Sequence, residues 1–241
     1  MKNNKYQSIT GDKLKRFYII QENGKSTLCL KYCANKISIE VPFILNEKVA
    51  SLAGMMPDGS LIRDLRRIYF SQKKDLAKNY LFRDLILELF NPNNKIFIRS
   101  GHNAYDTYTN STVLAHFLYY LLDFKKSDEE MRVPQWIFNS PDSVKRAYLR
   151  EAFAMEGCIP KALKEIRFIT KDHDYALDIE QLLLALGINS FVKERIGGTY
   201  NTIQYRVSIY RGVNFQKFKE IGFTAPLHVP RFKLICQKYN I

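Results

Sequence analysis

The sequence carries one pattern of segments twice, and this duplication restricts the possible folds more than any other feature. Each copy begins with a helix-like apolar stretch that ends in an acidic residue followed by glycine, at Asp58 and at Glu156. Twelve residues after each acid stands a phenylalanine in a β-rich segment, Phe70 in the first copy and Phe168 in the second. Because the spacing is the same, the chain is predicted to contain two units of one fold.

The segments that follow also correspond. In each copy the β-rich segment leads to an amphipathic helix, two further strand-like segments and a short closing helix. The segments of the first copy are 66–73, 76–90, 95–99, 105–109 and 112–122. Those of the second copy are 164–171, 175–186, 191–195, 203–210 and 215–221. The shared order helix–strand–strand–helix–strand–strand–helix predicts an α+β chain that arose by internal duplication.

The charge indicates the kind of partner. Lysine and arginine total 37 against 24 acidic residues, a net charge of +13. Such an excess favours a polyanion, most often nucleic acid and less often a membrane surface, over solubility alone. Residues 127–142 break the pattern, with four acids and one base, and are typical of a linker. We therefore expect a basic β-rich extension (1–45), a first repeat (46–126), the linker (127–142) and a second repeat (143–241).

Other classes of protein are disfavoured. The four cysteines form no C-x-x-C pair, and with four histidines a zinc ribbon or finger is not expected. The sequence shows no signal peptide, P-loop, glycine-rich nucleotide motif or Ser–His–Asp pattern. The longest apolar run, 113–122, is shorter than the roughly twenty residues of a membrane span. We expect a soluble, intracellular protein, cytoplasmic and nucleoid-associated, with no membrane partner.

The two acid–glycine motifs resemble those of a known family. Leu149–Gly157 reads L-R-E-A-F-A-M-E-G, which is similar to the LAGLIDADG form L-R-G-L-F-D-A-E-G. Asp58, in the run D-G-S-L, resembles the family form G-D-G-S-L. The lead-in V-P-Q-W-I-F from Val133 and the run E-I-G-F from Glu220 are also similar. The chain thus looks like a LAGLIDADG homing endonuclease with two repeats in one chain, over about residues 36–236.

The resemblance implies a fold and a chemistry. It implies two αββαββα repeats related by a pseudo-twofold axis, with the motif helices packed at the centre and antiparallel sheets forming a DNA-binding saddle. It implies that Asp58 and Glu156 hold Mg²⁺ or Mn²⁺ and that one phosphodiester is hydrolysed in each strand, leaving a staggered cut. The partner would be double-stranded DNA with a long asymmetric target. The alternative is that both acid–glycine pairs are helix ends only.

Further residues follow from the same resemblance. Gln72 and Thr170 would hold metal-bound water, and Lys73 and Lys171 would support charge on the phosphate; the alternative is that all four are solvent-facing strand ends. Arginine can read guanine and lysine neutralises phosphate, so basic residues on or beside the strands are candidates for DNA contact. The candidates are Arg63, Arg66, Lys74, Arg99, Lys125, Lys193, Arg195, Arg206 and Arg211. Sequence does not fix which face of a strand each occupies.

Three alternatives for the whole protein remain open. The first is an active, intron-encoded, monomeric endonuclease. The second is a DNA-binding protein or RNA splicing maturase of the same fold that does not cleave, the maturase having intron RNA as its partner. The third is an endonuclease domain from an intein, which we expect least because the chain has no nucleophilic first residue and no C-terminal His-Asn pair. The extension, with strands expected at 14–20, 26–32 and 36–41, either lengthens the DNA footprint or braces the first repeat.

Overall fold

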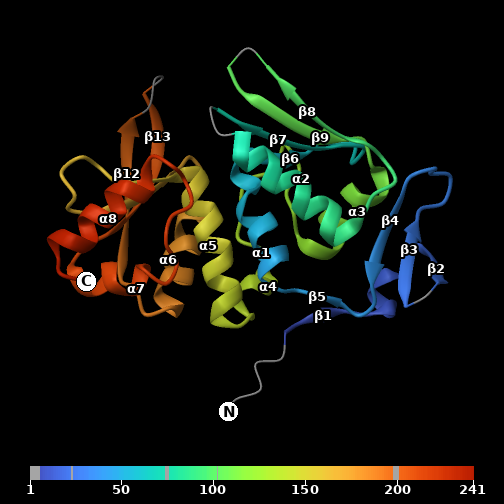
Figure 1. Ribbon diagram of the computed structural model, residues 1–241, viewed down its shortest axis with the longest axis horizontal. Helices are drawn as coiled ribbons and strands as arrows, with labels where there is room; N and C mark the ends of the chain where they lie inside the picture. Colours follow the sequence, from blue (N-terminus) through green and yellow to red (C-terminus); the bar gives the residue numbers. More distant parts are fainter. Residues whose placement is uncertain (1–5, 23, 74–75, 102, 198–200) are drawn as a thin grey trace. The chain divides into compact units, whose positions relative to one another are not determined.

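The computed structural model is a mixed α+β chain that divides into two compact units (Figure 1). It describes residues 6–22, 24–73, 76–101, 103–197 and 201–241. Unit 1 comprises Met1–Glu129 and Pro134–Pro141, and unit 2 comprises Glu130–Val133 and Asp142–Ile241. Within the part of the chain that is described, no helix has the length and apolar character needed to cross a membrane.

Unit 1 contains the first repeat, which is built on a four-stranded antiparallel sheet in the order β6-β7-β9-β8. Its elements are α1 (Glu47–Gly54), a 3₁₀ turn η2 (Met56–Asp58), β6 (Gly59–Leu61), β7 (Ile68–Gln72), α2 (Leu76–Phe90), β8 (Ile96–Ser100), β9 (Tyr105–Thr109) and α3 (Thr112–Leu122). Helix α2 packs against β7 and β9. The short helix α4 (Gln135–Phe138) also belongs to this unit.

Unit 2 contains the second repeat, whose sheet has the same topology, β10-β11-β13-β12. Its elements are α5 (Asp142–Glu156), β10 (Gly157–Cys158), β11 (Ile166–Thr170), α6 (His173–Ala185), β12 (Ser190–Gly197), β13 (Thr202–Ile209), α7 (Gly212–Phe218) and α8 (His228–Lys238). The register repeats too, because Gly59 pairs with Phe70 and Gly157 pairs with Phe168. The predicted α+β fold with two repeats and antiparallel sheets is confirmed.

Local chemistry explains where several of these elements begin and end. The Asn46 side chain accepts hydrogen bonds from the backbone N–H groups of Lys48 and Val49, which caps α1 as its sequence predicts. Gly187 follows α6 with a φ of +72°, a left-handed conformation that glycine adopts without strain.

The glycines after the two acids have a different function from the helix stops that the sequence predicts. Gly59 has a φ of −119° and belongs to a strand. A Cβ on Gly157 would lie 2.3 Å from the carbonyl oxygen of Phe153, so this position excludes every side chain. Close approach of the backbone, and not left-handed conformation, therefore accounts for both glycines.

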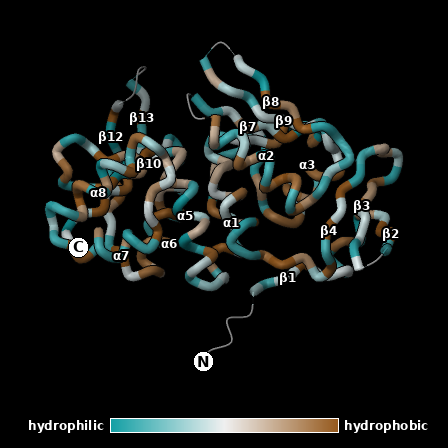
Figure 2. Tube along the Cα trace, viewed as in Figure 1, coloured by the Kyte–Doolittle hydropathy of each residue, from teal (hydrophilic) through white to brown (hydrophobic). Residues whose placement is uncertain are grey.

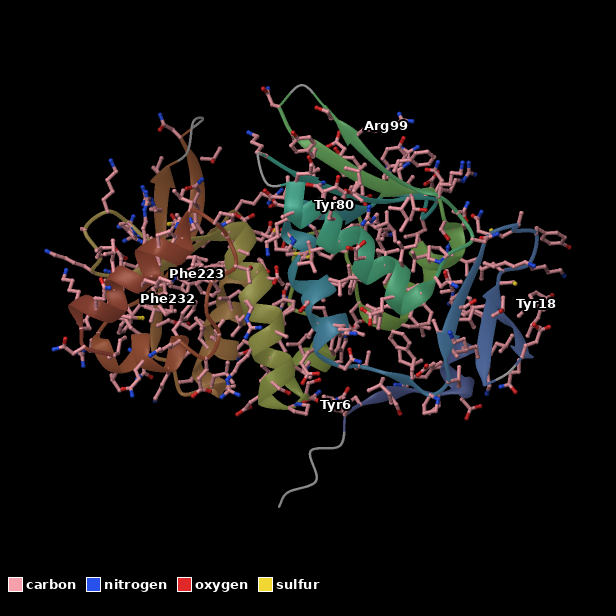
Figure 3. All side chains as sticks on the ribbon, viewed as in Figure 1. Tyr6, Tyr18, Tyr80, Arg99, Phe223 and Phe232 are labelled. Carbon is pink, nitrogen blue, oxygen red and sulfur yellow. The ribbon has the colours of Figure 1, made fainter. Side chains whose placement is uncertain are left out.

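Each unit has its own aromatic core. In unit 1 Phe70 stacks on Phe82 at 4.8 Å between ring centroids, which fixes α2 on the sheet. The apolar helix α3 adds six buried residues to this core (Figure 2). In unit 2 Phe223 and Phe232, labelled in Figure 3, lie 5.7 Å apart between α7 and α8. Helix α8 is an addition to the repeat that the sequence analysis did not predict.

The N-terminal residues form a small sheet on unit 1. The strands β2 (Tyr18–Glu22), β3 (Lys25–Cys29) and β4 (Lys36–Glu40) are antiparallel, and β4 contacts α2 and α3. Strands β1 (Ser8–Ile9) and β5 (Phe43–Ile44) pair separately. Leu14 lies in a 3₁₀ helix, η1 (Gly11–Leu14), where the sequence predicts a strand from that residue. The extension thus braces the first repeat; the four segment boundaries remain predictions.

Candidate nucleic-acid interface and acidic sites

Asp58 ends the turn η2 and stands directly before the first strand of the first repeat. Gln72 is the last residue of β7, the strand paired with β6, and its amide Nε2 donates a hydrogen bond to Asp58 Oδ2. Burial raises the pKa of Asp58 from 3.8 to about 6, although the Gln72 hydrogen bond acts in the opposite direction. The fold therefore brings together two of the residues that the resemblance selects, and it holds a carboxylate where ionisation is unfavourable without a compensating charge.

Glu156 occupies the same position in the second repeat. It is the last residue of α5, is half-buried, and directly precedes β10. Its charge contributes to the raised pKa of Tyr175, a buried hydroxyl 3.1 Å from the hydroxyl of Tyr148, although burial is the main cause. Two equivalent chain positions thus present a carboxylate at the start of a sheet.

The other residues predicted at these sites also occupy matched positions. Thr170, like Gln72, ends the second strand of its sheet, but its Oγ1 accepts a hydrogen bond from the backbone N–H of Asp172 at 3.2 Å. Its hydroxyl therefore supports the turn into α6. Lys73 and Lys171 directly follow β7 and β11, and both are exposed.

The sheet of unit 1 has one face that no helix of its repeat covers. Ile68, Phe70 and Thr107 are buried on the face toward α2. Side chains alternate along a strand, so their neighbours lie on the opposite side. We call this side open face 1; it consists of Tyr69, Ser71, Phe97, Arg99, Asp106 and Tyr108. Figure 3 shows Arg99 on this side of the sheet, with Tyr80 on α2 below it.

Open face 1 is held by contacts between its own residues. The hydroxyls of Tyr69 and Ser71 donate to Asp106 Oδ1 at 2.5 and 2.8 Å. The Arg99 guanidinium lies 5.2 Å from the ring centroid of Tyr108, and that of Arg67 lies 4.9 Å from the same ring. A rigid surface with a carboxylate acceptor and two cations can form hydrogen bonds to base edges and phosphates together.

The equivalent face in unit 2 is more basic. Phe168, Val207 and Ile209 are buried toward α6, and the opposite side is open face 2. Its members are Arg167, Ile169, Phe191, Lys193, Arg195 and Arg206. Lys193 and Arg206 are directly opposite each other in the register. Arg206 occupies the position that Asp106 has in the first repeat, so the two faces differ in charge at equivalent points.

Sequence reasoning placed some of these residues and missed others. Arg99, Lys193, Arg195 and Arg206 are predicted, and the structure places them on the two open faces. Arg67, Asp106, Tyr108 and Arg167 were missed, although Arg67 is next to a predicted residue. The signal for Asp106 was its position between strand residues of alternating burial, which becomes informative only when the helix-covered face is known.

The remaining candidates lie outside the open faces. Arg63 and Arg66 are exposed in the β6–β7 connection and pair with Asp128 and Asp64 at 3.3 and 3.4 Å. The Lys125 carbonyl accepts a hydrogen bond from Leu61 N, which adds this segment to the edge of the sheet. Lys74 lies outside the described residues.

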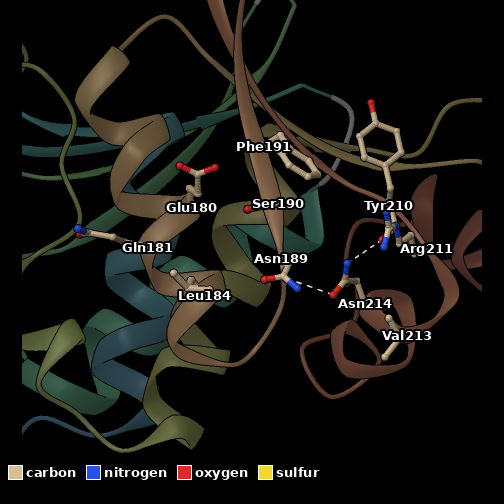
Figure 4. A pocket seen from close by; sticks show the side chains of 10 residues that line it. All are labelled: Glu180, Gln181, Leu184, Asn189, Ser190, Phe191, Tyr210, Arg211, Val213 and Asn214. Carbon is tan, nitrogen blue, oxygen red and sulfur yellow. Dashed lines mark hydrogen bonds between the residues drawn. The ribbon is translucent and has the colours of Figure 1, made fainter.

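Arg211 has a different environment. It precedes α7 with a φ of +74° and lines a cavity of about 450 Å³ in unit 2 (Figure 4). Asn214 spans this cavity wall, accepting from Asn189 N at 3.2 Å and donating to the Tyr210 carbonyl at 2.8 Å. Arg211 is therefore at the helix end of the sheet's last connection.

Comparison with known proteins identifies the second repeat directly. Residues 143–222 match the family model of the LAGLIDADG-like domain. The chain is 30% identical over 160 residues to the GyrA-type polypeptide of DNA gyrase from Mycobacterium leprae, an alignment that covers 56% of this chain. It spans only 12% of the length of that gyrase polypeptide.

Two solved structures share the fold. The crystal structure of I-DmoI in complex with DNA and calcium superimposes with a TM-score of 0.57 at 18% identity, covering 79% of this chain and 98% of I-DmoI. The full-length WhiA protein of Thermatoga maritima has a TM-score of 0.51 at 13% identity, covering 82% of this chain and 62% of WhiA. At these identities the similarity concerns the fold.

Proposed function

Because the chain belongs to the LAGLIDADG family, with two repeats in one polypeptide, we propose that it is a site-specific endonuclease acting on double-stranded DNA. The observation that carries the proposal is the equivalence of Asp58 and Glu156. Each carboxylate directly precedes the glycine that begins the first strand of its sheet, and each glycine pairs with a phenylalanine. Random helix ends have no reason to reproduce this register.

Charge and shape support DNA as the substrate. The net charge of +13 favours a polyanion, and both open faces consist of strands that carry arginine or lysine. I-DmoI, which shares the fold, has been crystallised with DNA. Since Asp106 and Arg206 occupy equivalent positions, the two faces suit different base sequences, and the proposed target is long and asymmetric.

The donor chemistry of the acidic sites fits Mg²⁺ or Mn²⁺. Mg²⁺ is commonly held by one or two carboxylates together with substrate phosphates. Asp58 offers a carboxylate whose raised pKa shows that its charge lacks compensation, and a divalent cation would supply it. In the described part of the chain, no group of three or more His, Cys, Asp or Glu residues is placed to hold a metal. When bound, the cation activates water and stabilises the leaving 3′ oxygen.

The chain's own residues have defined parts in this proposal. Asp58 and Glu156 hold the cations, and Gln72 orients the Asp58 carboxylate through its amide hydrogen bond. Lys73 and Lys171 neutralise charge on the attacked phosphate. Water attacks phosphorus, the bond to the 3′ oxygen breaks, and that oxygen takes a proton; one such hydrolysis in each strand gives a double-strand break.

Cleavage of a randomised duplex library in Mg²⁺ tests the function. We expect discrete cut sites for the natural protein, and loss of cutting with retained DNA binding for Asp58→Asn and for Glu156→Gln. Asp64→Asn is the matched control, since Asp64 is an exposed acid of the same unit paired with Arg66. Unaltered cutting by the Asp58→Asn variant would contradict the proposal.

A second candidate is a DNA-binding protein that does not cleave. The likeness to WhiA, whose name does not describe an endonuclease, favours it. Retention of specific duplexes with a steep salt dependence, without any cut in Mg²⁺ or Mn²⁺, would select this candidate over the first.

A further inference from the structure

Tyr32 is the most exposed large side chain among those that the structure describes, with 96% of its surface accessible. Its φ is +62°, a conformation that few residues other than glycine, asparagine and aspartate adopt. The ammonium of Lys31 lies 5.2 Å from the ring centroid. The chain thus holds an aromatic ring and a cation in solvent in a conformation that does not favour tyrosine.

The loop that carries these two residues is firmly attached to the first repeat. Asn35 Oδ1 accepts a hydrogen bond from the backbone N–H of Thr112, the first residue of α3, at 3.0 Å. On the other side, Lys36 N donates to Asn93 Oδ1 at 2.7 Å, and Asn93 N donates to the Lys36 carbonyl at 3.1 Å. The position of Tyr32 is therefore set by unit 1 and not by a free hairpin.

These attachments place the loop at one end of open face 1. Asn93 precedes β8, and Thr112 follows β9, so both flank the end of the sheet at which Ile96 pairs with Thr109. Figure 1 shows the β3–β4 loop at the end of the small sheet that is nearest to β8 and β9. A duplex lying along open face 1 would reach this loop next.

The charge around the loop is positive. Lys31, Lys36 and Lys95 are all exposed, and Arg67 lies at the same end of the sheet, hydrogen-bonded to Asn110 at 2.7 Å. Phosphate groups are the complementary partner for such a group of cations, and an aromatic ring can pack against sugar or base.

We propose that Lys31 and Tyr32 form an additional DNA contact that extends the footprint of unit 1 beyond the end of open face 1. The contact is to the sugar-phosphate backbone of the duplex flank, and the inference rests on the proposed binding of DNA but not on cleavage. Bracing of the first repeat uses the other side of the small sheet, where Leu28, Ile37 and Ile39 are buried. Tyr32 adds nothing to that packing, so its exposure requires another purpose.

The test compares two double variants on the duplex recovered from the library. Lys31→Ala/Tyr32→Gly removes the cation and the ring, and glycine suits the positive φ, so the loop keeps its fold. Arg83→Ala/Tyr80→Ala is the matched control, because it removes a second exposed cation–aromatic pair, 4.8 Å apart, from α2 on the covered side of the sheet. The readouts are the dissociation constant, its salt dependence and hydroxyl-radical footprinting.

We expect the loop variant to bind about five- to tenfold more weakly, with the salt slope reduced by about one. Protection should disappear only at the outer base pairs of one flank, and a duplex shortened at that flank should bind both variants equally. Identical footprints for the two variants, with duplex binding intact, would refute this inference alone. Failure of the natural protein to bind any duplex would refute both proposals, whereas binding without cleavage leaves this one supported.

Discussion

Replacing Asp58 by asparagine should stabilise unit 1 at neutral pH when divalent ions are absent. Asparagine keeps an oxygen that accepts the Gln72 hydrogen bond but removes the buried charge. The pKa of Asp58 rises from 3.8 to about 6 in the folded protein, so the folded state binds its proton more tightly than the unfolded state. Stability of the natural protein therefore falls as pH rises from about 4 to about 6 and then stays low.

The size of the effect follows from the same pKa. The rise corresponds to about 3 kcal/mol at pH 8 and to about 0.5 kcal/mol at pH 4, since near pH 4 the folded carboxyl is already protonated. Urea unfolding followed by tryptophan fluorescence measures it, because Trp136 is the chain's one tryptophan, is buried, and donates to the Leu122 carbonyl within unit 1.

The control and the refuting result are clear. Asp64→Asn, at an exposed position, should change the free energy of unfolding by less than about 0.5 kcal/mol at either pH. Mg²⁺ should stabilise the natural protein more than the Asp58→Asn variant. An equal unfolding free energy for the natural protein and Asp58→Asn at pH 8, without divalent ions, would show that burial does not disfavour this charge.

Three further outcomes are expected. Gly157→Ala places a Cβ 2.3 Å from the Phe153 carbonyl oxygen and should cost about 3 kcal/mol or more in calorimetry, whereas Gly11→Ala, which meets nothing within 4 Å, should cost little. Asn46→Ala removes the cap of α1 and should lower the free energy of unfolding by about 1 kcal/mol; an unchanged melting temperature would contradict that function. Asp106→Ala should alter base preference at one target position in a binding-selection assay while leaving other positions unchanged.

Much of the fold was predictable because its signals are local. The predicted bounds 76–90, 105–109 and 112–122 agree with α2, β9 and α3, whose ends have turn or capping residues. The match between repeats depends on spacing alone and needs no knowledge of packing. Helix α8 was missed because it follows the repeat, so the internal comparison offered no equivalent segment.

The interface residues were less predictable for a physical reason. In β8 the residues Ile96 and Ile98 alternate with Phe97 and Arg99, so both sides of the strand contain large apolar groups. The covered side is decided by α2, and this tertiary contact has no trace in the periodicity. The hydrogen bond between Gln72 and Asp58 likewise depends on pairing of β6 with β7, although the sequence placed both residues among the candidates.

The most direct test of the central claim is strand-resolved cleavage of the selected duplex in Mg²⁺ by the natural protein, Asp58→Asn and Glu156→Gln. Binding of each to the uncut duplex is measured in Ca²⁺. The account predicts a double-strand break by the natural protein, and loss of that break in both variants at nearly unchanged affinity. A double-strand break that persists in either variant would contradict the assignment of Asp58 and Glu156 as the paired catalytic acids.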